Sequence, residues 1–131
     1  MNAEYLNTLP EVANRWGVEL EDGEKVVFAA KLNVFGTEKD RMLGTDKSNF
    51  TLTNRRIIAN NTIATWTVGI SEDVASWGSA TTGKFIFKST IFRVLLNDEM
   101  EYDYGKAKLN GFNFYLKGSD LSKLLEITNK A

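Results

Sequence analysis

The sequence predicts a mainly β domain: a small antiparallel barrel of about seven strands, capped by a C-terminal α-helix. From Lys25 onward, apolar and polar side chains mostly alternate, which is the period of half-buried strands. The last segment instead spaces its apolar residues for one face of a helix, at Leu121, Leu124, Leu125 and Thr128. We therefore divide the chain into an N-terminal helical extension, residues 1–24, and a barrel with its helix, residues 25–131.

The extension carries an apolar stripe that predicts helix over residues 2–17, in one or two pieces. The stripe consists of Tyr5, Leu6, Leu9, Val12, Ala13 and Trp16. Residues 8–11 resemble a capping box with proline in the first turn, so a second helix is predicted to start there. Gly17 is expected to end it, and residues 19–24 form an acidic loop. The stripe either packs on its own barrel or contributes to a subunit interface through Tyr5, Leu9 and Trp16.

The first strands are predicted from clean alternation. Inward positions of the first strand are Val26, Phe28, Ala30, Leu32 and Val34. Residues 35–49 contain two glycines and many charges, which favours a mobile loop or a frayed hairpin over a packed strand. Two further strands, 50–53 and 57–59, flank a reversal at residues 54–56, with Thr51 and Thr53 pointing outward.

The second half of the barrel is predicted from shorter runs. Predicted strands cover residues 64–70, 84–89, 90–96, 100–104 and 112–116. Residues 71–73 interrupt the first of these, and Val74 to Trp77 either extends it or forms a short edge piece. Residues 78–83 and Asn97-Asp98 are predicted turns, and Ser119 or Asp120 is expected to cap the last helix.

Composition argues against most catalytic chemistry. The chain has no histidine and no cysteine, which removes imidazole bases, thiolate nucleophiles and the commonest transition-metal ligands. Glu99, Glu101 and Asp103 lie along one strand face, where their side chains diverge instead of converging on one ion. We therefore expect a non-enzymatic protein with no metal and no cofactor, and we identify no small-molecule substrate.

Charge and hydropathy narrow the expected partners. A formal net charge of -1 gives no global field that attracts nucleic acid, and the aromatic residues lack interleaved lysines and arginines. The first twenty residues have no basic start followed by an apolar core, and no stretch is long enough to span a membrane. We expect an unexported cytoplasmic protein that does not bind nucleic acid.

One motif points to a family. The run Phe50-Thr-Leu-Thr-Asn-Arg-Arg-Ile-Ile, preceded by Gly44-Thr-Asp-Lys-Ser, resembles the bacterial pleckstrin-homology-like (PH-like) family, close to the GRAM-like domains. The resemblance covers roughly residues 25–129 and implies a seven-stranded, partly open barrel with the motif at the junction of its second and third strands. The same scaffold serves lipid binders, peptide binders and assembly modules, so the resemblance implies fold more than function.

Basic residues supply the candidate anion sites. Arg55 and Arg56 could fork onto phosphate or carboxylate, or one of them could pair with an acidic residue and fix the turn. Lys31, Lys39 and Arg41 have the spacing of the headgroup site of lipid-binding PH domains. Our first hypothesis is a module for protein interaction or self-association, and the alternative is a binder of anionic lipid through the basic residues of 35–49, with a weak membrane contact.

Overall fold

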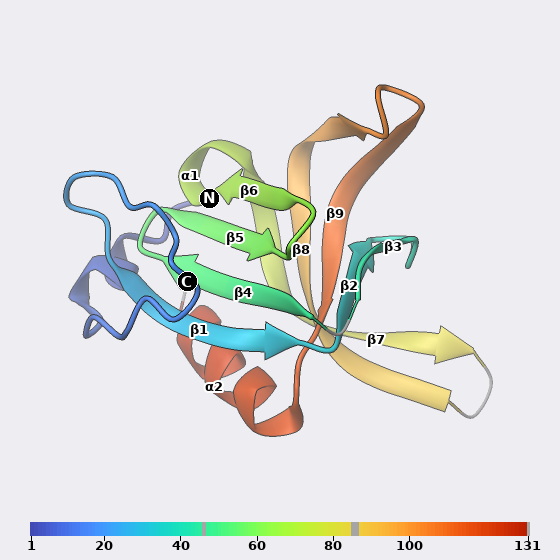
Figure 1. Ribbon diagram of the computed structural model, residues 1–131. Helices are drawn as coiled ribbons and strands as arrows, with labels where there is room; N and C mark the ends of the chain where they lie inside the picture. Colours follow the sequence, from blue (N-terminus) through green and yellow to red (C-terminus); the bar gives the residue numbers. More distant parts are fainter. Residues whose placement is uncertain (46, 85–86, 131) are drawn as a thin grey trace.

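The fold is mainly β with a C-terminal helix, as predicted, and its strands form two antiparallel sheets. A computed structural model describes residues 1–45, 47–84 and 87–130 (Figure 1). In the four-stranded sheet the order is β1 (Val26–Leu32), β4 (Ser48–Thr53), β5 (Arg56–Asn60), β6 (Thr65–Gly69). In the five-stranded sheet it is β3 (Met42–Gly44), β2 (Val34–Thr37), β9 (Ala107–Tyr115), β8 (Phe87–Tyr102), β7 (Val74–Lys84).

A single bent strand joins the two sheets. Only Asn33 separates β1 from β2, and its backbone N–H donates to the Tyr115 carbonyl at 2.8 Å. β1 pairs with β4, whereas β2 pairs with β3 and β9, so the chain leaves one sheet and enters the other at this corner. When the two sheets are joined at this corner, β1 continues into β2 and β4 lies in line with β3. The combined strand order is then β6, β5, β4 with β3, β1 with β2, β9, β8, β7, around a common interior.

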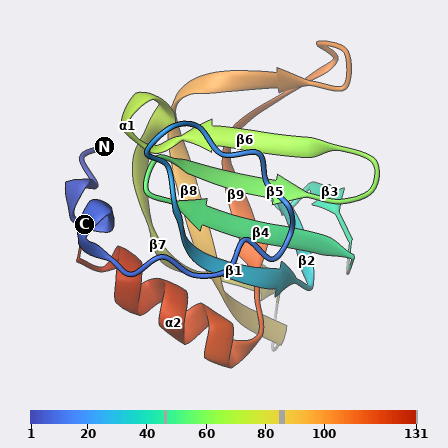
Figure 2. The same cartoon turned by 60° about the vertical axis from the view of Figure 1, so that its left-hand side comes forward.

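Phenylalanines from both sheets fill that interior. Phe50 of β4 is fully buried, with its ring 5.0 Å from Phe114 of β9 and 6.2 Å from Phe92 of β8, both edge-on. Edge-to-face aromatic pairs are favourable beyond the area they bury, so these rings tie the sheets together. Helix α2 (Gly118–Thr128) lies along the bottom of the molecule in Figure 2. Its residues Leu121 and Leu124 are buried as part of this core.

The predicted N-terminal helix is wrong. The structure has only a five-residue 3-10 helix, η1 (Glu4–Thr8), and an irregular segment after it. The Lys25 ammonium donates to the carbonyls of Asn7 and Leu9, at 2.8 and 2.5 Å, and thereby takes acceptors that a longer helix would use. Gly17 does adopt a positive φ of 65°, but in a turn closed onto Asn14, not at a helix end.

The described residues in the range 35–49 also contain more strand than predicted. Phe35 is fully buried in β2, which forms a hairpin with β3 and a ladder with β9. Gly44 makes room for that ring, because a Cβ on Gly44 would lie 2.1 Å from the Phe35 ring. Thr51 and Thr53, predicted to point outward, are buried at 1% and 0% exposure.

Two segments that were predicted to be turns lie within strands. Residues 78–83 lie within β7, and Asn97-Asp98 lies within β8, where the register with β9 shifts between Leu95 and Met100. The predicted interruption at residues 71–73 is confirmed as the single helical turn α1 (Ile70–Asp73). Predicted strand 84–89 includes residues 85–86, which lie outside the described residues. No side chain caps α2, whose N-cap residue is Lys117, so the predicted Ser119 or Asp120 cap is wrong.

Candidate functional site

The paired arginines of the β4–β5 turn have different environments. Arg56 forks onto Glu24, with Nε to Oε2 at 2.8 Å and Nη2 to Oε1 at 2.6 Å, and also donates to the Glu19 carbonyl. The Glu24 side chain is fully buried, and the Thr53 hydroxyl and the Glu21 N–H donate to it as well. Every donor holds the carboxylate in its charged form, so Arg56 is committed to this contact.

The network shifts the protonation of both partners. Burial acts to raise the pKa of the Glu24 carboxyl, but hydrogen bonds from Arg56, Thr53 and the Glu21 backbone outweigh it and lower that pKa from 4.5 to about 2. The hydrogen bond to Glu24 raises the pKa of Arg56. The pair therefore stays ionised at any ordinary pH.

Asn54 completes the same structural cluster. Its Oδ1 accepts from the Lys25 N–H at 2.9 Å, and its Nδ2 donates to Asn7 Oδ1 at 2.8 Å and to the Gly23 carbonyl. The polar residues of the family-like motif thus bind the chain that enters β1. We conclude that Thr53, Asn54 and Arg56 hold the fold in place.

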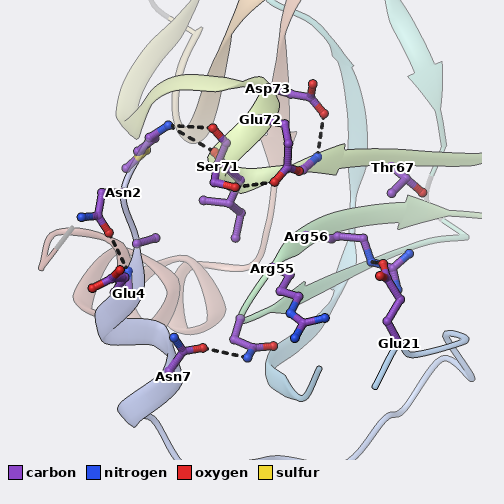
Figure 3. Close-up of a pocket in the computed structure, with 15 residues that line it drawn as sticks. Asn2, Glu4, Asn7, Glu21, Arg55, Arg56, Thr67, Ser71, Glu72 and Asp73 are labelled. Carbon is purple, nitrogen blue, oxygen red and sulfur yellow. Dashed lines mark hydrogen bonds and ion pairs between the residues drawn. The ribbon is translucent and has the colours of Figure 1, made fainter. Parts of the chain in front are cut away.

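Arg55 lines a cavity of about 1040 Å³ between the N-terminal residues, the β4–β5 turn and α1 (Figure 3). Among the described residues, none accepts a hydrogen bond from its guanidinium group. The same cavity is lined by carboxylates, namely Glu4, Glu21, Glu72 and Asp73. The lining also contains three cations, namely Arg55, Arg56 and the Met1 ammonium, so the four carboxylates leave only a slight excess of negative charge, which does not favour an anionic ligand.

The basic residues of the predicted headgroup site are exposed. Lys31 lies on β1, while Lys39 and Arg41 flank Asp40 in the β2–β3 turn. Asp40 adopts a positive φ of 58° and accepts from Tyr115 Oη and Asn113 Nδ2, both at 2.8 Å. These bonds dock the turn onto the outer face of the five-stranded sheet and leave the two flanking basic side chains in solvent.

The candidate interface residues lie partly within the fold of their own chain. Tyr5 and Leu9 are half-buried and pack against the core, and the Tyr5 hydroxyl donates to the Ile127 carbonyl of α2. Burial raises the pKa of Tyr5. Trp16 is half-buried with the Arg15 guanidinium 4.6 Å above its ring. Tyr5 and Leu9 thus contribute to fixing the N-terminal segment on α2.

Sequence reasoning missed the free edge of the five-stranded sheet. β7 is its last strand and has eleven residues, and its pairing with β8 is regular from Ser76 to Lys84. No backbone hydrogen bond from a turn or loop reaches it among the described residues. The predicted turn at 78–83 concealed this edge, because its small residues resemble a loop.

It also missed three exposed apolar side chains at hairpin ends. Met42 of β3 is 67% exposed, Ile63 in the β5–β6 turn 92%, and Tyr104 in the β8–β9 turn 100%. The three hairpin ends lie on the same side of the molecule in both views (Figures 1 and 2). Tyr104 has a positive φ of 54°, an uncommon conformation for an aromatic residue.

Comparisons of the chain with protein-family models, curated proteins and solved structures find no match. Across the described ranges, no helix has both the length and the apolar character needed to cross a membrane.

Proposed function

We propose that the chain is a PH-like barrel that acts as a non-enzymatic assembly module and pairs with a second copy of itself through β7. The strand order supports the barrel. β1 and β2 follow one bent path, and β3 pairs with β2 as β4 pairs with β1. Counting each of these two pairs as one strand reduces the nine labelled strands to seven, in an order that runs from β6 to β7. α2 packs against β7 and β8, as the capping helix of such a barrel would.

The chemistry of the β7 edge carries the assembly proposal. From Val74 to Gly83 the strand contains no charged residue and no proline, the two features that most often protect an edge. Its only register shift lies at the start, between Val74 and Ser76. Antiparallel pairing of this edge with its own copy places uncharged residues opposite one another, so no like charges oppose a two-fold contact.

The test is the oligomeric state. Light scattering after size exclusion is expected to give at least twice the chain mass for the native protein. Thr81→Lys puts a charge on the free edge and is expected to give a monomer. Thr90→Lys is the matched control, because Thr90 pairs with Thr81 but lies one strand inward. A native protein that stays monomeric over a wide concentration range would contradict the proposal.

A second candidate is contact with an anionic membrane surface. The exposed apolar residues at three hairpin ends favour it, because Lys39 and Arg41 lie in one of those turns and Lys106 in another. Apolar tips that enter the interface and cations that meet anionic headgroups are the two requirements for such binding.

Vesicle sedimentation at low salt separates this candidate from the first. Binding is expected to rise when phosphatidylserine is added to phosphatidylcholine vesicles, and to fall in Ile63→Asp and in Lys39→Glu/Arg41→Glu. Lys117→Glu/Lys123→Glu at α2 reverses the same number of positive charges elsewhere and controls for net charge. Equal sedimentation with neutral and anionic vesicles would rule out binding to an anionic membrane surface.

A further inference from the structure

The outer edge of β1 is covered by an irregular segment, residues 10–16, which we call the strap. β1 is the last strand of the four-stranded sheet, so one of its edges faces away from β4. The Val12 N–H donates to the Val26 carbonyl at 2.9 Å, and Arg15 Nη1 donates to the Ala29 carbonyl at 3.2 Å. The strap therefore satisfies two edge carbonyls of β1 as a neighbouring strand would.

The strap is held much more weakly than its two ends. Before it, Leu6 is fully buried; after it, the Glu24–Arg56 network fixes residues 19–24. All residues from Pro10 to Arg15 are exposed. Two hydrogen bonds to β1 and no buried side chain over six residues give the middle of the segment little hold on the barrel.

A groove lies beneath the strap, between β1 and α2. Its cavity of about 520 Å³ is lined by Val12, Ala13 and Arg15 of the strap, by β1, and by α2. β1 contributes Val27 and Phe28, and α2 contributes Ile127 with the charged residues Asp120, Lys123 and Glu126. The groove thus combines a sheet edge, an apolar floor and a wall in which carboxylates outnumber ammonium groups.

We propose that this groove binds an extended, arginine-bearing peptide segment of a partner protein, and that the strap is a displaceable stand-in for that segment. The strap itself defines the ligand chemistry: a backbone N–H for the Val26 carbonyl, and three residues later an arginine for the Ala29 carbonyl. Arg15 forms no ion pair with any residue that the structure describes, and Asp120 and Glu126 line the same groove as carboxylates that a partner's arginine would meet. The site is separate from β7 and goes beyond self-pairing of the barrel.

The strap lowers the affinity of such a partner, because only the population with an open groove can bind. Val12→Pro removes the N–H that bonds to Val26 and is expected to open the groove. Ala13→Pro introduces the same residue next to it and keeps the Val12 N–H, so it serves as the matched control. Arg15→Ala removes the hydrogen bond to the Ala29 carbonyl without restricting the backbone. This variant can therefore be measured even if Val12→Pro does not fold.

The probe is a fluorescein-labelled peptide with the sequence of residues 9–17, added to the full-length variants and followed by fluorescence anisotropy. Val12→Pro and Arg15→Ala are expected to bind it at least about tenfold more tightly than the native chain and Ala13→Pro. A peptide with glutamate in place of its arginine is expected not to bind. Asp120→Lys/Glu126→Lys is expected to abolish the gain.

Equal binding by all variants would overturn the proposal, and so would a gain that survives the α2 substitutions. Thr81→Lys is expected to leave peptide binding unchanged, so failure of the β7 proposal and failure of the groove proposal are distinguishable. Association of the Val12→Pro/Thr81→Lys chain with the Thr81→Lys chain, whose strap is intact, would identify the strap of a second copy as the occupant and would overturn the partner-peptide assignment.

Discussion

In both the β4–β5 turn and the β2–β3 turn, hydrogen bonds fix one charged side chain while a charged neighbour stays exposed. The two turns differ in the sign of the fixed charge. In the first, the cation Arg56 is fixed by buried Glu24 while its neighbour Arg55 is exposed. In the second, the anion Asp40 is fixed by Asn113 and Tyr115, and its basic neighbours are exposed. In both turns the burial of the partner, and not the sign of the charge, separates a structural residue from one that is available for contact.

The largest expected effect tests the anchor of the β4–β5 turn. Arg56→Ala leaves the fully buried Glu24 carboxylate without its cation, which is expected to cost about 4 kcal/mol of unfolding free energy. Urea denaturation followed by tryptophan fluorescence measures it. Glu24→Gln in the Arg56→Ala background should recover part of the loss because the buried charge is gone. A cost below about 1 kcal/mol for Arg56→Ala would show that Glu24 does not depend on this pair.

Acid titration probes the same anchor without changing Arg56. The pKa of Glu24 is lowered from 4.5 to about 2, so its contribution is complete above 4.5 and is lost as the pH falls toward 2. The loss is expected to be on the order of 3 kcal/mol. Glu24→Gln should be less stable at pH 6 and should lose correspondingly less stability over this range. Parallel stability curves for the two proteins below pH 4.5 would contradict the assignment.

A smaller effect is expected for the anchor of the β2–β3 turn. Asp40→Ala removes the acceptor for Tyr115 Oη and Asn113 Nδ2 and places alanine at a φ of 58°, so we expect a loss of about 2 kcal/mol. Asp40→Asn keeps an acceptor oxygen and tolerates this φ, and is expected to lose less than half as much. Thermal unfolding of both variants measures the difference, and equal losses would show that the hydrogen bonds contribute nothing.

The smallest effects are expected at the exposed neighbours. Arg55→Ala and Lys39→Ala should each change the unfolding free energy by no more than about 0.5 kcal/mol, because neither side chain has a partner among the described residues. The same urea titrations supply the values. A loss at Arg55 comparable to that at Arg56 would remove the contrast between the two arginines.

Much of the fold could be predicted because it depends on local periodicity. Alternation located β1, β4 and β6, and the spacing of Leu121 and Leu124 located α2. Two of the failures involve partners distant in sequence. Thr53 reads as a solvent-facing residue until Glu24 is placed against it, 29 positions away. The N-terminal stripe has helical spacing, yet contacts with Lys25 and α2 limit it to one short 3-10 helix.

The candidate site was harder to predict because the sequence shows which residues are charged but not which side chains are exposed to solvent. Arg55 and Arg56 are equivalent in the sequence, and only the structure distinguishes them. The alternation of apolar and polar residues does not reveal the β7 edge, because Gly78, Ser79 and Gly83 are residues typical of a turn. Thr81 and Thr82 were a usable signal, because threonine is favoured in strands.

The corner at Asn33 has a consequence for how the molecule unfolds. Because β1 and β2 are one continuous strand, neither sheet is complete without residues that also complete the other. Partial opening of one sheet would release the shared strand from both and expose the phenylalanines between them. We therefore expect one cooperative unfolding unit, with the slowest amide hydrogen exchange in β1, β2, β4 and β9 and faster exchange in the strap.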